Sequence, residues 1–166
     1  MNRLVRNLSA TLLALTATQT PLLFGAPQAV AETREFYIVS VHYDGVTNPK
    51  GDATHGPEPF PDKPFASTNG MWVKGPQPNG DWAVRAFVFD PAQVTVQQGD
   101  EVRLVFVGIH GGGHTIVVDG VDKPVSVKRG TTQTVSFKAD KPGLISYTCT
   151  DHPPSMKGQV VVLPKN

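Results

Sequence analysis

The sequence predicts an all-β fold, a Greek-key β-sandwich with a long irregular excursion near its N-terminal end. Beyond residue 31, no stretch repeats apolar residues at helical spacing. Short runs rich in β-branched and aromatic residues recur instead, and turn residues separate them. Glycine and proline account for 16 and 15 of the 166 residues. Short strands divided by turns at regular spacing are typical of a sandwich or barrel.

The first 31 residues carry the pattern of a secretory signal peptide. Arg3 and Arg6 precede a mostly apolar stretch without acidic residues, from Leu8 to Leu23, and Ala29-Val30-Ala31 supplies a small-residue cleavage site. Thr, Gln and Pro interrupt the apolar stretch, which favours a cleaved signal over a membrane helix. We therefore expect export to the periplasm, with cleavage near Ala31 and no membrane insertion of the mature chain.

The mature chain, residues 32–166, is expected to form a single domain and to be a monomer. Cleavage removes two of the 15 Lys and Arg residues and none of the 14 Asp and Glu residues, which leaves a net charge of −1. This near balance argues against nucleic acid or a membrane surface as the main partner. The only cysteine, Cys149, cannot form an internal disulfide, so in an oxidising compartment it should be buried or held as a metal thiolate.

The strands are expected in the following order. Glu35–Tyr43 alternates well enough for a first strand. Residues 44–80 are rich in Pro, Gly, Asn and Asp, with Met71-Trp72-Val73 as the one apolar run, and predict an irregular insertion. The core of the domain then spans residues 83–164, approximately. Its expected strands are Trp82–Phe89, Gln93–Val96, Val102–Val107, Thr115–Val118, Pro124–Val127, Thr132–Phe137, Leu144–Thr148 and Gln159–Leu163.

Three side chains suited to copper lie on one short loop between the last two expected strands. Cys149, His152 and Met156 offer a thiolate, an imidazole and a thioether. One further histidine would complete the His₂Cys set with a weak axial methionine that defines a blue, or type 1, copper centre. Pro153 and Pro154 fix two backbone φ angles and stiffen the loop. The pattern therefore predicts one mononuclear copper site.

His114 and His110 compete for the place of the second histidine ligand. We favour His114 because it opens an apolar strand, which gives a ligand rigid support. His110 lies on the far side of the triple glycine. His42 and His55 lie in or near the insertion with Asp44, Asp52 and Glu58 close in sequence, so a labile second metal site there stays open.

Three stretches of the sequence resemble the cupredoxins, the family of plastocyanin, amicyanin and pseudoazurin. They are Phe89-Asp90-Pro91 followed by Gln98-Gly99-Asp100, then Gly113-His114-Thr115, and finally Cys149 to Met156 running into Lys157-Gly158. The resemblance implies a type 1 copper ion held by His114, Cys149, His152 and Met156, with the His152 imidazole at the surface as the exit for the electron. Three residues separate His152 from Met156, whereas plastocyanin-like loops have four and amicyanin-like loops two.

These patterns predict a periplasmic protein that carries single electrons by cycling between Cu(II) and Cu(I). Redox protein partners would dock near His152. The alternative is a cupredoxin for copper tolerance, buffering or delivery that works with copper-handling proteins, in which residues 44–80 add contacts. An enzyme is not expected, because Met156 would fill the axial position that a catalytic metal keeps open.

Overall fold

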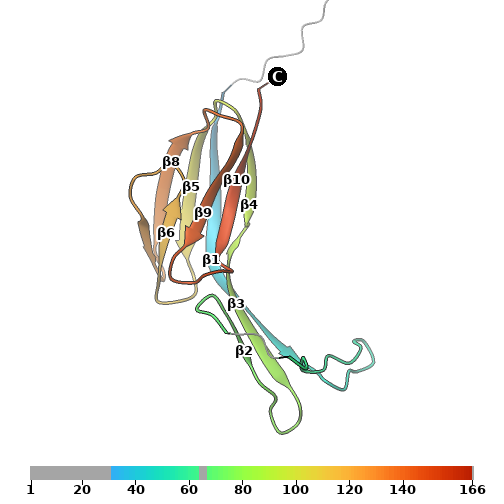
Figure 1. Cartoon of the computed structure of the whole chain (residues 1–166). Coiled ribbons are helices and arrows are strands. Elements are labelled where there is room, and N and C mark those ends of the chain that lie inside the picture. The colour runs from blue at the N-terminus through green and yellow to red at the C-terminus, as the bar shows by residue number, and fades with distance from the viewer. Residues whose placement is uncertain (1–30, 64–66, 166) are drawn as a thin grey trace, which may run out of the picture.

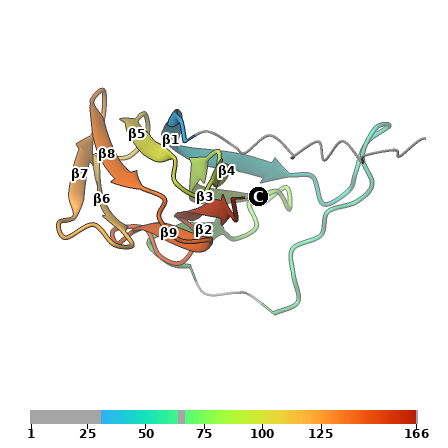
Figure 2. The same ribbon diagram turned by 90° about the horizontal axis from the view of Figure 1, so that it is seen from above.

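The computed structural model describes residues 31–63 and 67–165, and all regular structure in this part of the chain is β-strand. The signal-peptide prediction for residues 1–31 lies outside the described residues, apart from Ala31. Ten strands form two five-stranded sheets with the orders β2-β3-β1-β5-β8 and β4-β10-β9-β6-β7. The sheets pack as a sandwich (Figures 1 and 2), so the predicted all-β sandwich is confirmed. The described residues contain no helix able to cross a membrane.

Most strand bounds agree with the apolar runs of the sequence to within a few residues. Two of the neighbouring strand pairs, β1 with β5 and β4 with β10, are parallel, and the others are antiparallel. The strands are β1 (Thr33–Thr47), β2 (Met71–Lys74), β3 (Trp82–Asp90), β4 (Gln93–Gln97), β5 (Glu101–Gly108), β6 (Gly113–Val118), β7 (Val125–Lys128), β8 (Thr132–Lys138), β9 (Gly143–Cys149) and β10 (Lys157–Leu163).

The region predicted as an irregular insertion, residues 44–80, contains strand at both ends. β1 continues to Thr47, and Met71–Lys74 forms β2. Both strands pair with β3, which lies between them and satisfies their backbone hydrogen-bonding groups. The described residues between these two strands form no strand. The pairing depends on a distant partner strand, and the local composition, rich in turn-forming residues, does not reveal it.

The core of the sandwich follows the alternation of the sequence. In β5, Val102, Leu104 and Phe106 are fully buried, whereas Glu101 and Arg103 are exposed. At the centre, the rings of Phe89, Phe106 and Tyr147 pack with centroids 5.2 to 5.8 Å apart. The Tyr147 hydroxyl donates a hydrogen bond to the Pro91 carbonyl (3.1 Å), and burial raises the pKa of Tyr147 to about 12. This packed aromatic centre supports the strands that carry the candidate ligands.

A buried carboxylate ties the start of β1 to the turn between β4 and β5. Asp100 accepts hydrogen bonds from the backbone N–H groups of Glu32 and Gln97, both at 3.0 Å. Arg34 lies 3.5 Å from the same carboxylate. The hydrogen bond from Glu32, together with those from Gln97 and Arg34, holds the pKa of Asp100 below its usual value, although burial opposes the shift. Gly99, in the predicted turn, has φ = +95°, a conformation that favours glycine.

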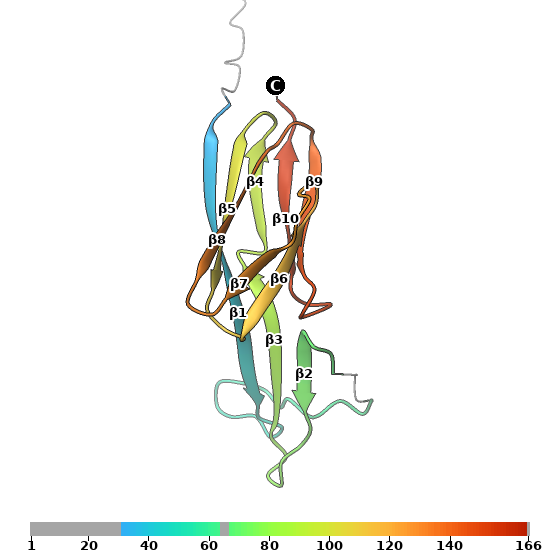
Figure 3. The same ribbon diagram turned by 90° about the vertical axis from the view of Figure 1, so that its left-hand side faces the viewer.

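β1 and β3 continue past one end of the sandwich, where β2 pairs with β3 and where the loop between β9 and β10 also lies (Figures 1 and 3). We call this extension, residues 41–47, 67–74 and 82–87, the arm. Its cross-strand pairs include Asp44 with Arg85, joined by an ion pair, and Arg85 with Trp72, whose ring centroid lies 5.2 Å from the guanidinium. Within the arm, all of which the structure describes, Gly70 is the only buried residue. The arm therefore has no hydrophobic core of its own.

Candidate metal centre

The antiparallel pairing of β6 and β9 brings two of the predicted ligands to the same end of the second sheet. Cys149 is the last residue of β9, and His114 is the second residue of β6. Cys149 pairs with Ile116, so the beginning of β6 lies beside the end of β9. Both side chains are buried, with 0 % exposed for Cys149 and 1 % for His114. Strand pairing thus fixes these two donors within the sandwich.

Two hydrogen bonds join the loop after Cys149 to the strand that carries His114. The N–H of Thr150 donates to the carbonyl of Thr115 (2.9 Å), and the N–H of Thr115 donates to the Asp151 carboxylate (2.6 Å). These contacts link residues 35 and 36 apart in sequence. They hold the two ligand-bearing segments in a fixed relation.

The donor atoms of three predicted ligands converge on one point. The Nδ1 atom of His114 lies 3.7 Å from the Cys149 Sγ atom, and the Nδ1 atom of His152 lies 3.4 Å from it. All three donor atoms lie within 4.8 Å of one another, and among the described residues this is the only such group of three. A first-row metal such as zinc forms bonds of about 2.3 Å to sulfur and about 2.0 Å to nitrogen. When two such bonds meet at a wide angle, the sulfur and nitrogen atoms lie about as far apart as the Cys149 Sγ atom and the two Nδ1 atoms do here.

A carbonyl group sets the tautomer of His114. Its Nε2 atom lies 2.6 Å from the carbonyl oxygen of His110. A carbonyl can only accept, so Nε2 carries the proton and the lone pair of Nδ1 is free to bind a metal. The His110 ring points elsewhere, with its Nδ1 atom accepting the backbone N–H of His42 at 3.1 Å. His110 therefore supports the candidate ligand His114, and its own ring does not join the cluster.

Met156 is the last residue of the loop that follows Cys149. Its side chain is fully buried and belongs to the same hydrophobic cluster as Cys149. The Met156 carbonyl accepts the N–H of Cys149 (2.9 Å), and the Met156 N–H donates to the carbonyl of His152 (3.2 Å). These bonds hold the Met156 backbone next to Cys149 and His152, and axial ligation by the thioether stays a prediction.

The surroundings favour neutral donors at neutral pH. Burial raises the pKa of the Cys149 thiol, and hydrogen bonds from the backbone N–H groups of Asp151 and His152 only partly oppose this shift. Burial lowers the pKa of His152, and the nearby His114 lowers it further. At neutral pH the metal-free site thus holds a protonated thiol beside a neutral imidazole. A metal cation must displace the thiol proton when it binds.

The donor set fits copper. A thiolate and a thioether are soft ligands, and imidazole suits copper in both of its common oxidation states. A copper ion bound here would supply a reversible one-electron change between Cu(II) and Cu(I). The four side chains and their backbone supports are what the protein itself contributes.

The other histidines do not form a second group of three donors in the described residues. His42 stacks on His110 with ring centroids 4.0 Å apart, and its Nε2 atom lies 3.3 Å from the Asp44 carboxylate. Burial lowers the pKa of His42, and the neighbouring Arg85 contributes to the shift. His55 is exposed, and its Nδ1 atom lies 3.5 Å from the Asp52 carboxylate.

Three residues that the sequence did not indicate join the ligand loop to the arm: Phe87 and Gly70 in the arm, and Ser155 in the loop. The Phe87 ring stacks on the His152 ring with centroids 4.1 Å apart. The Ser155 hydroxyl lies 2.7 Å from the Gly70 carbonyl and 2.8 Å from the Phe87 carbonyl. These contacts span 85 and 68 residues of sequence, so no local pattern could have revealed them.

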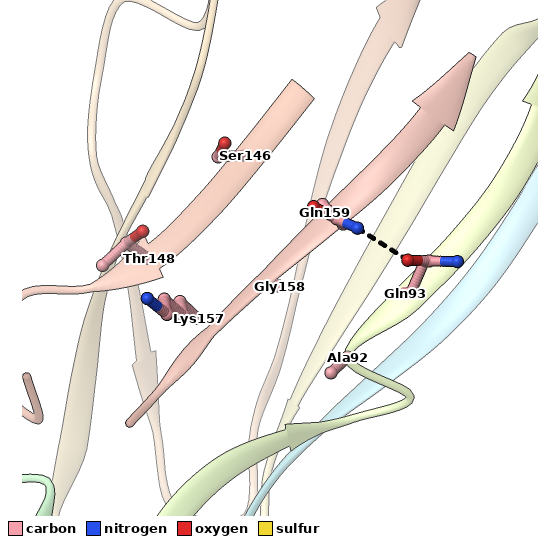
Figure 4. A pocket seen from close by; sticks show the side chains of 7 residues that line it. All are labelled: Ala92, Gln93, Ser146, Thr148, Lys157, Gly158 and Gln159. Atoms are coloured by element: carbon pink, nitrogen blue, oxygen red, sulfur yellow. Dashed lines mark hydrogen bonds between the residues drawn. The ribbon is translucent and has the colours of Figure 1, made fainter. Parts of the chain in front are cut away.

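A surface hollow is lined by parts of three strands of the second sheet. It measures about 460 Å³ and occupies the side of the sheet formed by β4, β9 and β10 (Figure 4). A hydrogen bond of 2.6 Å joins Gln159 to Gln93 across it. None of the four candidate ligands lines this hollow. The lining residues are Ala92, Gln93, Ser146, Thr148, Lys157, Gly158 and Gln159.

Comparison with known proteins gives the family. Residues 77–162, about half of the chain, match the model of the cupredoxin-like domain. The chain belongs to this family, as its resemblance to cupredoxins predicted. No curated protein sequence matches the chain.

Two solved structures, with TM-scores of 0.51 and 0.50, show the same fold at low sequence identity. Copper nitrite reductase from Nitrosomonas europaea is 22 % identical with a TM-score of 0.51, over 81 % of this chain and 42 % of the reductase. The multicopper oxidase mgLAC is 20 % identical with a TM-score of 0.50, over 82 % of this chain and 40 % of the oxidase. This chain thus spans about two fifths of the length of each. Auracyanin A, a blue copper protein of Chloroflexus aurantiacus, is 21 % identical with a TM-score of 0.37, over 46 % and 89 % of the two chains.

Proposed function

We propose that this cupredoxin binds one type 1 copper ion through His114, Cys149, His152 and Met156 and carries single electrons. The observation that supports this proposal most strongly is the convergence of the two Nδ1 atoms on the Cys149 sulfur, at 3.7 and 3.4 Å. Soft sulfur donors combined with two imidazoles are the ligands of a blue copper centre. Membership of the cupredoxin-like family agrees with this assignment.

The chain's own residues would keep such a site nearly unchanged between the two oxidation states. Strand pairing holds Cys149 and His114, the His110 carbonyl orients the His114 ring, and backbone hydrogen bonds hold Met156. When the protein already fixes the donor side chains in place, they need to move little as the copper ion changes between its two oxidation states. His152 is the only one of the four that is partly exposed, so we assign it the role of electron exit towards a docked redox partner.

Optical and electron paramagnetic resonance spectra of the copper-loaded protein test this proposal. We expect an intense visible thiolate-to-copper charge-transfer band, which Cys149→Ser abolishes because the thiolate is lost. His152→Gln should weaken the band, whereas His55→Gln, a matched control on an exposed histidine outside the cluster, should leave it unchanged. A wild-type protein that takes up copper without such a band would refute the proposal.

The proposed place of action is the periplasm. This part of the proposal rests on the signal-peptide pattern of residues 1–31, and the burial of the lone Cys149 is compatible with an oxidising compartment. Expression of the full chain followed by cell fractionation and mass measurement should give a periplasmic protein that begins near Glu32. Recovery of the full-length chain from the cytoplasm would contradict export.

A second proposed role is copper tolerance, buffering or delivery, and the arm is the observation that favours it. A minimal electron carrier has no need of a three-stranded extension against its ligand loop. Growth of a deletion strain separates the two roles. A defect only in excess copper supports tolerance, whereas a respiratory defect in ordinary medium supports electron transfer. Catalysis is the weaker candidate because Met156, as the proposed axial ligand, would fill the position that a reacting molecule needs.

A further inference from the structure

His152 differs from the buried candidate ligands in how it is held. Cys149 and His114 lie on paired strands, and Met156 is fully buried at the end of the loop between β9 and β10. His152 lies in the same loop and is partly exposed. The arm reaches this loop through its backbone. The N–H of Gly70 donates to the carbonyl of Pro153 (3.0 Å), and the Gly70 carbonyl accepts the N–H of Phe87 (2.7 Å). Gly70 thus joins the ligand loop to β3.

The Ser155 hydroxyl makes the same connection from the loop side. It lies within hydrogen-bond distance of the carbonyls of Gly70 (2.7 Å) and Phe87 (2.8 Å). A hydroxyl has one proton, so the two carbonyls share a single donor. Two segments of the arm are therefore held against one residue of the ligand loop.

The approach of Gly70 to His152 is too close for any other residue. A Cβ atom at Gly70 would overlap the carbonyl oxygen of His152 and would lie 2.8 Å from its carbonyl carbon. Glycine permits this approach because it has no side chain. The arm backbone therefore rests directly on the backbone of the candidate ligand.

Phe87 holds the His152 ring itself. The two rings stack with centroids 4.1 Å apart and planes 25° apart. The Phe87 ring also contacts the His42 ring edge-on, at 5.4 Å, on the arm. One face of the His152 ring is therefore covered by a side chain of the arm, and its Nδ1 atom is directed towards the Cys149 sulfur.

The geometry points to a positioning role for the arm: Gly70, Phe87 and Ser155 hold the ligand loop so that His152 faces Cys149 before any metal binds. This inference rests on the proposed copper site for its purpose. None of the three residues belongs to the donor set, so they act through His152. Reaching the buried Cys149 thiol from solvent requires the loop to open, and opening breaks the contacts with the arm.

Alkylation of Cys149 in the metal-free protein tests this role. Ser155→Ala removes the shared hydroxyl, and we expect the thiol to react about fivefold faster, the effect of losing one net hydrogen bond on the opening equilibrium. Ser155→Thr keeps a hydroxyl and should restore the slow rate. Ser67→Ala is the matched control. The Ser67 hydroxyl makes a hydrogen bond within the arm, accepting the backbone N–H of Val73 (3.2 Å), but is not bonded to the ligand loop.

The variants separate positioning from general stability. Unfolding free energies of Ser155→Ala and Ser67→Ala are measured alongside, so that alkylation rates are compared after correction for global stability. Equal corrected rates for the two variants would overturn the positioning role. The measurement needs no copper, so it can fail while the copper proposal stands, and a failure to bind copper leaves its result intact.

Hydrogen exchange of the wild-type protein gives a second test that needs no folded variant. The Gly70 amide, bonded to the Pro153 carbonyl, and the Met156 amide, bonded to the His152 carbonyl, should exchange with similar protection because one opening exposes both. A Gly70 amide that exchanges more than about tenfold faster than that of Met156 would show that the arm opens independently, and would overturn the inference.

Discussion

The sandwich and the arm hold the candidate metal centre in different ways. The sandwich strands bury alternate apolar side chains, and three of the four donors, Cys149, His114 and Met156, lie within its buried interior. The arm strands are half-buried, and Gly70, its only buried residue, touches the backbone of His152. Burial therefore fixes three donors, whereas the fourth depends on contact between two elements distant in sequence.

The largest effect on the free energy of unfolding should come from a substitution at the centre of the sandwich. Phe106→Ala removes a fully buried ring that packs on Phe89 and Tyr147. We expect the free energy of unfolding of the metal-free protein to fall by about 3–5 kcal/mol, the usual cost of the cavity left by a buried aromatic ring. Urea denaturation measures it. A loss under about 1 kcal/mol would show that the sandwich is not the stabilising unit.

Substitution of Asp100 should lower the free energy of unfolding by less, and the size of the loss should depend on pH. Asp100→Ala leaves the N–H groups of Glu32 and Gln97 unpaired, and we expect a loss of about 1–3 kcal/mol at pH 7. The folded state lowers the pKa of this carboxyl below the unfolded value of 3.8. Its contribution is therefore present above about pH 4 and is lost as the pH falls through the lowered pKa. Denaturation from pH 7 to pH 2 should show the two proteins converging, and a constant difference would contradict the carboxylate's role.

Met156→Leu should change stability little and the copper site more. A volume-conserving swap in a core costs less than about 1.5 kcal/mol. Loss of the thioether should leave copper bound and raise the reduction potential, because a weak donor that favours Cu(II) is gone. Voltammetry of the loaded protein measures the change. An unchanged potential would count against axial ligation by Met156.

Trp72→Leu, in the arm, should have the smallest effect on stability. The Trp72 ring packs on the Arg85 guanidinium at an incompletely buried position, where such a contact contributes less than about 1 kcal/mol. Urea denaturation should detect little change, in contrast to Phe106→Ala. A loss as large as that of Phe106→Ala would mean that the arm has a folding core of its own.

The sequence was most informative where local pattern and burial coincide. Alternating apolar residues predicted the sandwich strands, and the type and spacing of Cys149, His152 and Met156 predicted one loop of metal donors. The choice of His114 over His110 agrees with the observed cluster, because support from a strand is visible in sequence.

The sequence was least informative where the structure depends on distant contacts. Residues 44–47 and 71–74 were predicted to be irregular, yet they pair with β3. The partner of the His114 Nε2 atom is a backbone carbonyl, and since every residue has one, the sequence does not reveal it. Gly70, Phe87 and Ser155 meet at His152 only because the arm folds back on the ligand loop.

X-ray absorption at the copper edge tests the central claim most directly. We predict that copper in the loaded wild-type protein has one short bond to sulfur and two bonds to imidazole nitrogen. Cys149→Ser should lose the sulfur, and His114→Gln should lose one nitrogen. A first shell of oxygen and nitrogen alone in the wild-type protein would contradict the account.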